Sequence, residues 1–167
     1  MSYRAHTACM TREFKSLAFF PADHAEAVGG KLFVHGGYWG RLNFPVFPHA
    51  LPHMALGVVL EVPFAAYHAR HQFKIGMQDV DGHEFPLRVD GEFQVGAPPD
   101  IQYGDPTVMP LAIPLNNIVF ERPGSYVFTL AVDGEEIDRY AIRAYHVAVP
   151  VQLNLAPPPN PPQSQAG

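Results

Sequence analysis

The strongest periodic pattern in the chain lies between residues 121 and 145. Every second residue of its first half is large and apolar, at Tyr126, Phe128, Leu130 and Val132. This period of two predicts a strand with one buried face. A second alternating run follows the turn dipeptide Asp133-Gly134. The stretch therefore predicts a β-hairpin, with the other extended segments of the chain packed beside it.

The bulky residues on either side of the turn also predict the register of this hairpin. A two-residue turn would place Phe128 opposite Arg139 and bring a guanidinium to the apolar face. A three-residue loop over residues 132–134, with its glycine in the left-handed conformation, avoids that clash. This loop places Tyr126 opposite Tyr140. The same argument predicts a second hairpin with an odd-length loop around residues 80–82.

The remaining segments predict a two-layered all-β protein. Residues 15–20 and 31–37 are short apolar strands, and residues 54–62 are apolar almost without interruption, which is typical of a central strand buried on both faces. Residues 107–119 contain Pro110 and Pro114, which favours a strand at a sheet edge. About eight strands and no long helix predict an antiparallel β-sandwich, immunoglobulin-like or jelly-roll, with at most one or two short helical turns.

The chain divides into one domain and two terminal segments. Its 167 residues are typical of a single domain with a substantial core. Residues 1–13 have no periodic pattern and are interpreted as an N-terminal arm, followed by a β-sandwich domain over residues 14–155. Residues 156–167, APPPNPPQSQAG, predict a disordered proline-rich tail.

Composition narrows the classes of partner. The formal net charge of -5 argues against a nucleic-acid partner, because phosphate binding needs a basic face. Neither a basic amphipathic stretch nor an apolar run long enough to span a bilayer is present, so no membrane partner is expected. A single cysteine, Cys9, and an N-terminus without a signal-peptide pattern predict a cytoplasmic protein.

Three stretches carry a resemblance to a known family. They are FFPADHAEAVGGKLFVHGG at residues 19–37, the long run VPFAAYHARHQFKIGMQDVDGHEFPLRVDGEFQVGAPPD at residues 62–100, and FERPGSYVFTLAVDGEEI at residues 120–137. Together they resemble an uncharacterised bacterial family, a domain-of-unknown-function group common in actinobacteria, over roughly Leu17 to Val147. The resemblance implies a small β-rich domain. It implies no activity, because the shared motifs are turns and strand faces.

Histidine is the residue type that most suggests chemistry, with nine copies. His49 and His53 are four residues apart, and His68 and His71 are three apart, spacings that suit metal ligands on one face of a helix. Against this, Pro52 interrupts the first pair and a predicted change of structure interrupts the second. One hypothesis is therefore a metal-dependent enzyme or metal sensor, and the alternative is that these histidines lie on surfaces without a metal.

A second group of candidate residues is Tyr38, Trp39 and Arg41, which lie among the glycines 36, 37 and 40. Exposed aromatic side chains next to an arginine can bind a sugar or a peptide, so a carbohydrate-binding module is a further hypothesis. The competing interpretation is a core tryptophan at a bend, since large aromatic side chains dominate cores.

The leading functional hypothesis is a non-catalytic module for protein interaction or self-assembly. Carboxylates gather at two predicted hairpin tips, but acidic tips are common in solvated turns. No nucleophile elbow or phosphate-binding loop is present in the sequence. We therefore predict no catalytic residues and no cofactor, and we expect a protein partner or a homo-oligomer. The low share of charged residues, 16%, and the predicted edge strand favour this hypothesis.

Overall fold

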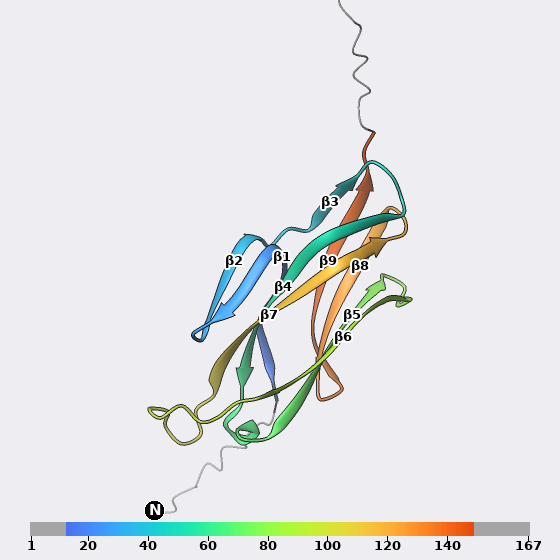
Figure 1. Cartoon of the computed structure of the whole chain (residues 1–167). Helices are drawn as coiled ribbons and strands as arrows, with labels where there is room; N and C mark the ends of the chain where they lie inside the picture. The colour runs from blue at the N-terminus through green and yellow to red at the C-terminus, as the bar shows by residue number, and fades with distance from the viewer. Residues whose placement is uncertain (1–12, 149–167) are drawn as a thin grey trace, which may run out of the picture.

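The computed structural model describes residues 13–148, which form two packed β-sheets (Figure 1). The nine strands of this part of the chain are β1 (Lys15–Val28), β2 (Lys31–Gly37), β3 (Arg41–Phe44), β4 (His49–Val62), β5 (Arg70–Asp79), β6 (Glu84–Gln94), β7 (Thr107–Phe120), β8 (Gly124–Val132) and β9 (Glu135–His146). One 3-10 helix, Phe64–Ala66, follows β4. The predicted N-terminal arm, except Glu13, and the predicted tail lie outside the described residues. No helix within residues 13–148 has the length and apolar character needed to cross a membrane.

The strand order is that of an immunoglobulin-type sandwich. One sheet has the order β2-β1-β4-β7, and the other has the order β3-β9-β8-β5-β6. The run β9-β8-β5-β6 corresponds to the G, F, C and C′ strands of that fold, and β4 with β7 corresponds to B and E. The sandwich prediction is confirmed, with one strand more than expected. One pair departs from the antiparallel rule, because β3 runs parallel to β9.

The core is built by alternate residues of the strands that lie inside each sheet. In β4, every second residue from Met54 to Val62 is fully buried, and the predicted central position of this strand is confirmed. Opposite it, β8 buries the apolar series predicted from the sequence, Tyr126 to Val132. Phe120 of β7 meets the Tyr126 ring edge-on, with 5.0 Å between ring centroids. These contacts join the two sheets.

The register of the β8–β9 hairpin corrects the prediction in one respect. Val132 pairs with Glu135, so the turn has two residues, with Asp133 and Gly134 both at positive φ. An irregularity next to Leu130 then shifts the register by one residue. Phe128 therefore meets Tyr140 on the same face, as the apolar pattern requires, whereas Tyr126 lies opposite Ile142 and not opposite Tyr140. The bulge removes the clash with Arg139 that we expected a longer loop to remove.

Two proline-containing segments are strand where the sequence suggested a break. β1 continues through Pro21 to Val28, because Pro21 lies where pairing with β2 only begins, at Ala22 and Gly37. There, a missing N–H costs little. Similarly, β4 begins at His49 and pairs with β7 on both sides of Pro52, so it starts before the strand predicted over residues 54–62. In the β5–β6 hairpin, Ile75 pairs with Val89, which confirms the predicted odd loop.

Candidate functional site

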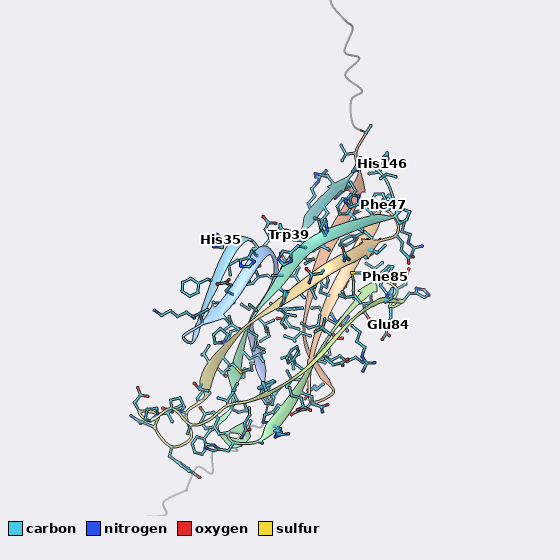
Figure 2. The ribbon with its side chains drawn as sticks, in the orientation of Figure 1. His35, Trp39, Phe47, Glu84, Phe85 and His146 are labelled. Carbon is cyan, nitrogen blue, oxygen red and sulfur yellow. The ribbon has the colours of Figure 1, made fainter. Side chains whose placement is uncertain are left out.

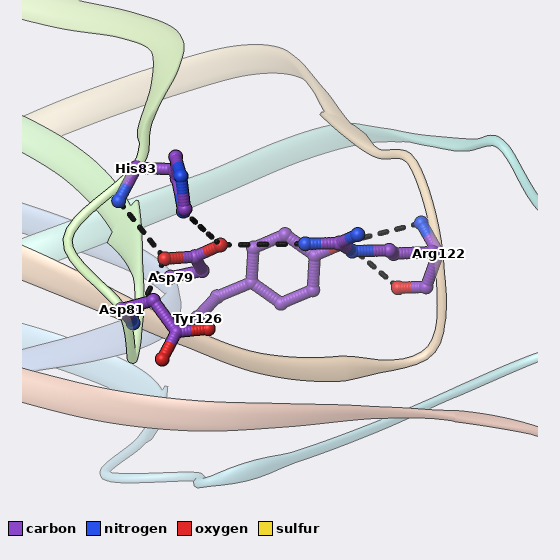
Figure 3. Close-up of polar contacts among 5 residues, drawn as sticks. All are labelled: Asp79, Asp81, His83, Arg122 and Tyr126. Atoms are coloured by element: carbon purple, nitrogen blue, oxygen red, sulfur yellow. Dashed lines mark hydrogen bonds and ion pairs between the residues drawn. The ribbon is translucent and has the colours of Figure 1, made fainter.

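One polar cluster lies at the tip of the β5–β6 hairpin, against the corner between β7 and β8 (Figure 3). Asp79 accepts hydrogen bonds from the backbone amides of Asp81 and His83, each at 2.9 Å. Its other oxygen lies 3.2 Å from His83 Nδ1 and 3.3 Å from an Arg122 guanidinium nitrogen. Asp79 is buried, with 6% of its surface exposed, whereas the other three side chains are exposed.

Tyr126 completes this cluster from the core side. Its hydroxyl donates to the Arg122 carbonyl at 2.7 Å and accepts from the Arg122 amide at 3.2 Å. A tyrosine near the start of this strand, bonded back to the preceding corner, is the tyrosine corner of immunoglobulin-like sandwiches. Asp79, Arg122 and Tyr126 thus hold the two loops together.

The chemistry of the cluster is structural. Asp79, Asp81 and His83 bring one possible ligand atom each within 4.8 Å of one another. The Asp79 oxygens, however, already accept two amide hydrogen bonds and an ion pair. Hydrogen bonds from the His83 amide, and next from the Asp81 amide, outweigh partial desolvation and hold the pKa of Asp79 below its ordinary value of 3.8.

This lowered pKa predicts how Asp79→Asn changes stability with pH. A carboxylate whose pKa is depressed in the folded state contributes stability above its unfolded pKa, and the contribution is lost as pH falls through the folded pKa. We expect the substitution to lower the thermal midpoint at neutral pH. The difference from the unsubstituted protein should shrink only as pH falls below 3.8 and through the lower folded pKa, where the Asp79 carboxylate takes up a proton. Equal midpoints at neutral pH would refute the structural role of Asp79.

His71, one of the histidines proposed as a metal ligand, is instead buried between Phe14 and Phe93. Its Nε2 lies 2.8 Å from the Ala66 carbonyl, and its Nδ1 lies 2.7 Å from a carboxylate oxygen of Asp133. Both ring nitrogens are thus within hydrogen-bond distance of an acceptor oxygen. No nitrogen of His71 is left to bind a metal.

The pairing with His71 also acts on Asp133. Partial burial by itself would raise the pKa of Asp133, but hydrogen bonds from the Gln72 amide and from His71 outweigh it and lower that pKa. Asp133 therefore links the β8–β9 turn to β5 as a carboxylate. Since His68 is exposed, with φ of 62°, and His71 is engaged inside, the two do not form a ligand pair.

The other predicted pair, His49 and His53, also separates in the structure. His49 is half-buried and stacks on Phe44, with ring centroids 4.1 Å apart. His53 is exposed, and its Nδ1 lies 3.0 Å from the amide oxygen of Asn116. The two rings thus have different partners.

The structure does bring His53 next to two histidines that we did not propose. His24 lies between His35 and His53, with ring centroids 6.2 Å and 6.0 Å away. The three come from β1, β2 and β4, and all are exposed. A signal for half of this arrangement is in the sequence, because a two-residue Gly29-Gly30 turn sets His24 opposite His35. No local pattern indicates His53.

Tyr38, Trp39 and Arg41 do not form one platform. Tyr38 is exposed, with φ of 64°, and its ring meets Tyr140 edge-on at 5.6 Å. Trp39 is half-buried and packs against the core, as the competing interpretation had it (Figure 2). The Arg41 guanidinium lies 4.1 Å above the ring of Tyr145. The three side chains therefore have different contact partners.

A shallow hollow lies on the outer face of the five-stranded sheet. It has a volume of about 460 Å³, and charged side chains of both signs, among them Lys74, Arg88 and Glu136, line it. Its lining includes no histidine and no cysteine. Its carboxylates, Glu84 and Glu136, lie among basic side chains of the same face.

The four outermost strands of the sheets differ in their capacity to accept a further strand. β7 is an edge strand, as predicted, but it carries Pro110 and Pro114. β6 carries Pro86 and charged residues at alternate positions, and β3 has only four residues. Among the outermost strands of residues 13–148, only β2 combines seven residues, no proline and a largely apolar sequence, KLFVHGG. Six of its residues are exposed.

The sequence of residues 17–145 matches a family of unknown function, DUF6941. The chain belongs to the DUF6941 family. This match confirms the resemblance to a domain of unknown function. It provides no information on activity. No curated protein is significantly similar to the DUF6941 chain in sequence.

The solved structures that match the DUF6941 chain are only distantly similar to it. An alkylpurine DNA glycosylase from Pseudomonas fluorescens matches at 13% identity and a TM-score of 0.42, over 81% of this chain and 31% of the glycosylase. A β-glucosidase from Listeria innocua matches at 10% identity and 0.41, over 82% and 16%. The C-terminal domain of wzt matches at 11% and 0.43, over 80% and 74%. The chain thus spans a third or less of the two enzymes, and these similarities say nothing about its activity.

Proposed function

We propose that this domain is a non-catalytic self-assembly module that forms a dimer by pairing the free edge of β2 with β2 of a second copy. The observation that carries the proposal is the contrast among the outermost strands of residues 13–148. Three of them carry proline or are very short, which are the features that protect sheet edges from pairing. β2 has neither feature.

The backbone of β2 offers a matching set of donors and acceptors. Val28 and Lys31 flank the two-residue turn, so they form a hydrogen-bonded pair. The N–H and C=O groups of the alternate residues Phe33 and His35 also point toward β1. The N–H and C=O groups of Leu32 and Val34 therefore point away from the sheet. Two such strands in antiparallel arrangement can exchange four hydrogen bonds.

The symmetry of a dimer sets the register of this pairing. Leu32 of one copy pairs with Val34 of the other, and the reverse, which places the two Phe33 residues directly opposite each other. Phe33 is 51% exposed and its neighbour Val28 is 59% exposed, so the pairing covers apolar surface. Aromatic side chains that face each other across two strands contribute roughly 0.5 kcal/mol or more. An isologous contact of this kind closes as a dimer.

Replacing Val34 by proline tests the proposal. Because the Val34 N–H points away from β1, a proline there removes a donor needed between copies and leaves the β1–β2 ladder intact. We expect the unsubstituted chain to sediment at twice the mass of one chain and Val34→Pro to sediment as a monomer with an unchanged circular dichroism spectrum. A matched control, Val108→Pro on the β7 edge, should stay dimeric. An unsubstituted chain that is monomeric at millimolar concentration would overturn the proposal.

A further inference from the structure

We propose that His24, His35 and His53 form a surface site for a divalent transition-metal ion such as Zn²⁺. The three imidazoles project from adjacent strands, β2, β1 and β4, and successive ring centroids are 6.2 Å and 6.0 Å apart. Two imidazoles bound tetrahedrally to one zinc have centroids roughly 5 Å apart, given a Zn–N distance of 2.0–2.1 Å. Binding one ion requires the three exposed side chains to rotate about their side-chain bonds and bring their rings closer together.

Asn116 prepares His53 for this role. Its amide oxygen lies 3.0 Å from His53 Nδ1 and is placed to accept a hydrogen bond from that nitrogen. The lone pair of the neutral ring is then on Nε2, on the other side of the imidazole. Histidines that bind metals commonly donate their second ring nitrogen to such an oxygen, which fixes the tautomer and the ring orientation.

Glu26 supplies a negative charge to the same group. Its carboxylate lies 3.3 Å from His24 Nε2, and its strand position is two residues beyond His24 on the same face of β1. The carboxylate can either orient His24 or bind the ion directly. Three imidazole nitrogens and one carboxylate oxygen make a donor set suited to tetrahedral Zn²⁺. Cu²⁺ is expected to compete for the same nitrogens, in keeping with its higher general affinity.

A metal at this position would connect the β1–β2 hairpin to β4. The hairpin already approaches β4 at Gly57, where a side chain would come within 3.0 Å of the Phe20 ring and 3.3 Å of Leu32. His24 and His35 belong to the hairpin, whereas His53 belongs to β4. Binding should therefore raise the thermal midpoint, since an ion that binds only the folded chain stabilises it.

The test is a calorimetric titration of the full chain with ZnCl₂, after purification without a histidine tag and removal of metal by a chelator. We expect one equivalent of Zn²⁺ to bind in the micromolar range. His24→Gln, His35→Gln and His53→Gln should each weaken binding at least tenfold, and Asn116→Ala should weaken it by roughly tenfold. A second titration with Co²⁺, followed by visible absorption, should give the spectrum of a tetrahedral site. His24→Gln should abolish this spectrum.

Matched controls separate this cluster from the other possible ligands of the chain. His49→Gln and His68→Gln should bind Zn²⁺ as the unsubstituted chain does, and so should the double variant His6→Ala, Cys9→Ser. Circular dichroism should show that every variant is folded. The proposal is overturned if no saturable binding occurs below the millimolar range. It is equally overturned if the His49, His68 or His6/Cys9 variants lose binding while the His24 and His53 variants retain it.

Discussion

Replacing Phe128 by alanine is expected to lower the free energy of unfolding by about 3–5 kcal/mol, the range typical of truncating a buried phenylalanine. Phe128 is fully buried. It lies at the centre of the five-stranded sheet, where it pairs with Met77 on β5 and Tyr140 on β9. Its removal would leave a cavity between the two sheets, because close-packed neighbours on both strands relax only partly.

Urea unfolding followed by tryptophan fluorescence and circular dichroism would measure this loss. The control is Val127→Ala on the same strand, whose side chain lies on the outer face and is half-buried. We expect the control to lose about 1 kcal/mol or less. Equal losses for the two variants would mean that Phe128 does not face the second sheet.

His71→Ala is expected to destabilise the domain by about 2–4 kcal/mol, because a ring packed between two phenylalanines is lost and the hydrogen-bond partners of both its nitrogens are left unsatisfied. The ring lies 4.8 Å from Phe14 and 5.5 Å from Phe93, centroid to centroid. Its truncation leaves the Ala66 carbonyl and the Asp133 carboxylate without their shared donor.

The same urea experiment, run with a chelator present, would measure the effect of His71→Ala. Lys74→Ala is the control, since this exposed residue lies on the same strand and should change stability by about 0.5 kcal/mol or less. The His71→Ala variant should bind Zn²⁺ as tightly as the unsubstituted chain does. A zinc affinity that falls with this substitution would contradict a purely structural role for the ring.

Much of the fold could be predicted because the apolar alternation is itself the cause of the sandwich. Tyr126 to Val132 and the run from Met54 to Val62 predict which faces are buried, and they are buried. Pro110 and Pro114 predict that β7 lies at an edge, and it does. Prolines remove donors, so their position carries information on neighbours as well as on the strand itself.

The features that were mispredicted depend on contacts between distant segments. The bulge near Leu130 shifts the register by one residue and puts Tyr140 on the same face as Phe128, as a three-residue loop would, so the alternation alone does not distinguish the two. The strand predicted over residues 15–20 stops before Pro21, although Pro21 lies within β1, whose pairing with β2 begins one residue later. Local propensity does not report which neighbour a strand has at each point.

The histidines show the same limit for the candidate site. The spacing rule proposed His49 with His53 and His68 with His71, but that rule applies to helices, and these residues lie in or next to strands. In a sheet, metal ligands that lie close together can come from neighbouring strands that are far apart in the sequence. The His24–His35 pairing follows from the Gly29-Gly30 turn, whereas the approach of His53 needs the long-range pairing of β1 with β4.

The most direct test of self-assembly through β2 is disulfide cross-linking of Phe33→Cys in a Cys9→Ser background. The proposed register puts the two residues 33 opposite each other in a non-hydrogen-bonded pair, with Cα atoms roughly 4.5 Å apart, within the range that a disulfide bridges. Lys31→Cys is the control, because its two copies would be about 13 Å apart along the strands. We predict a rapid covalent dimer for Phe33→Cys and not for Lys31→Cys; equally slow cross-linking of both would contradict the account.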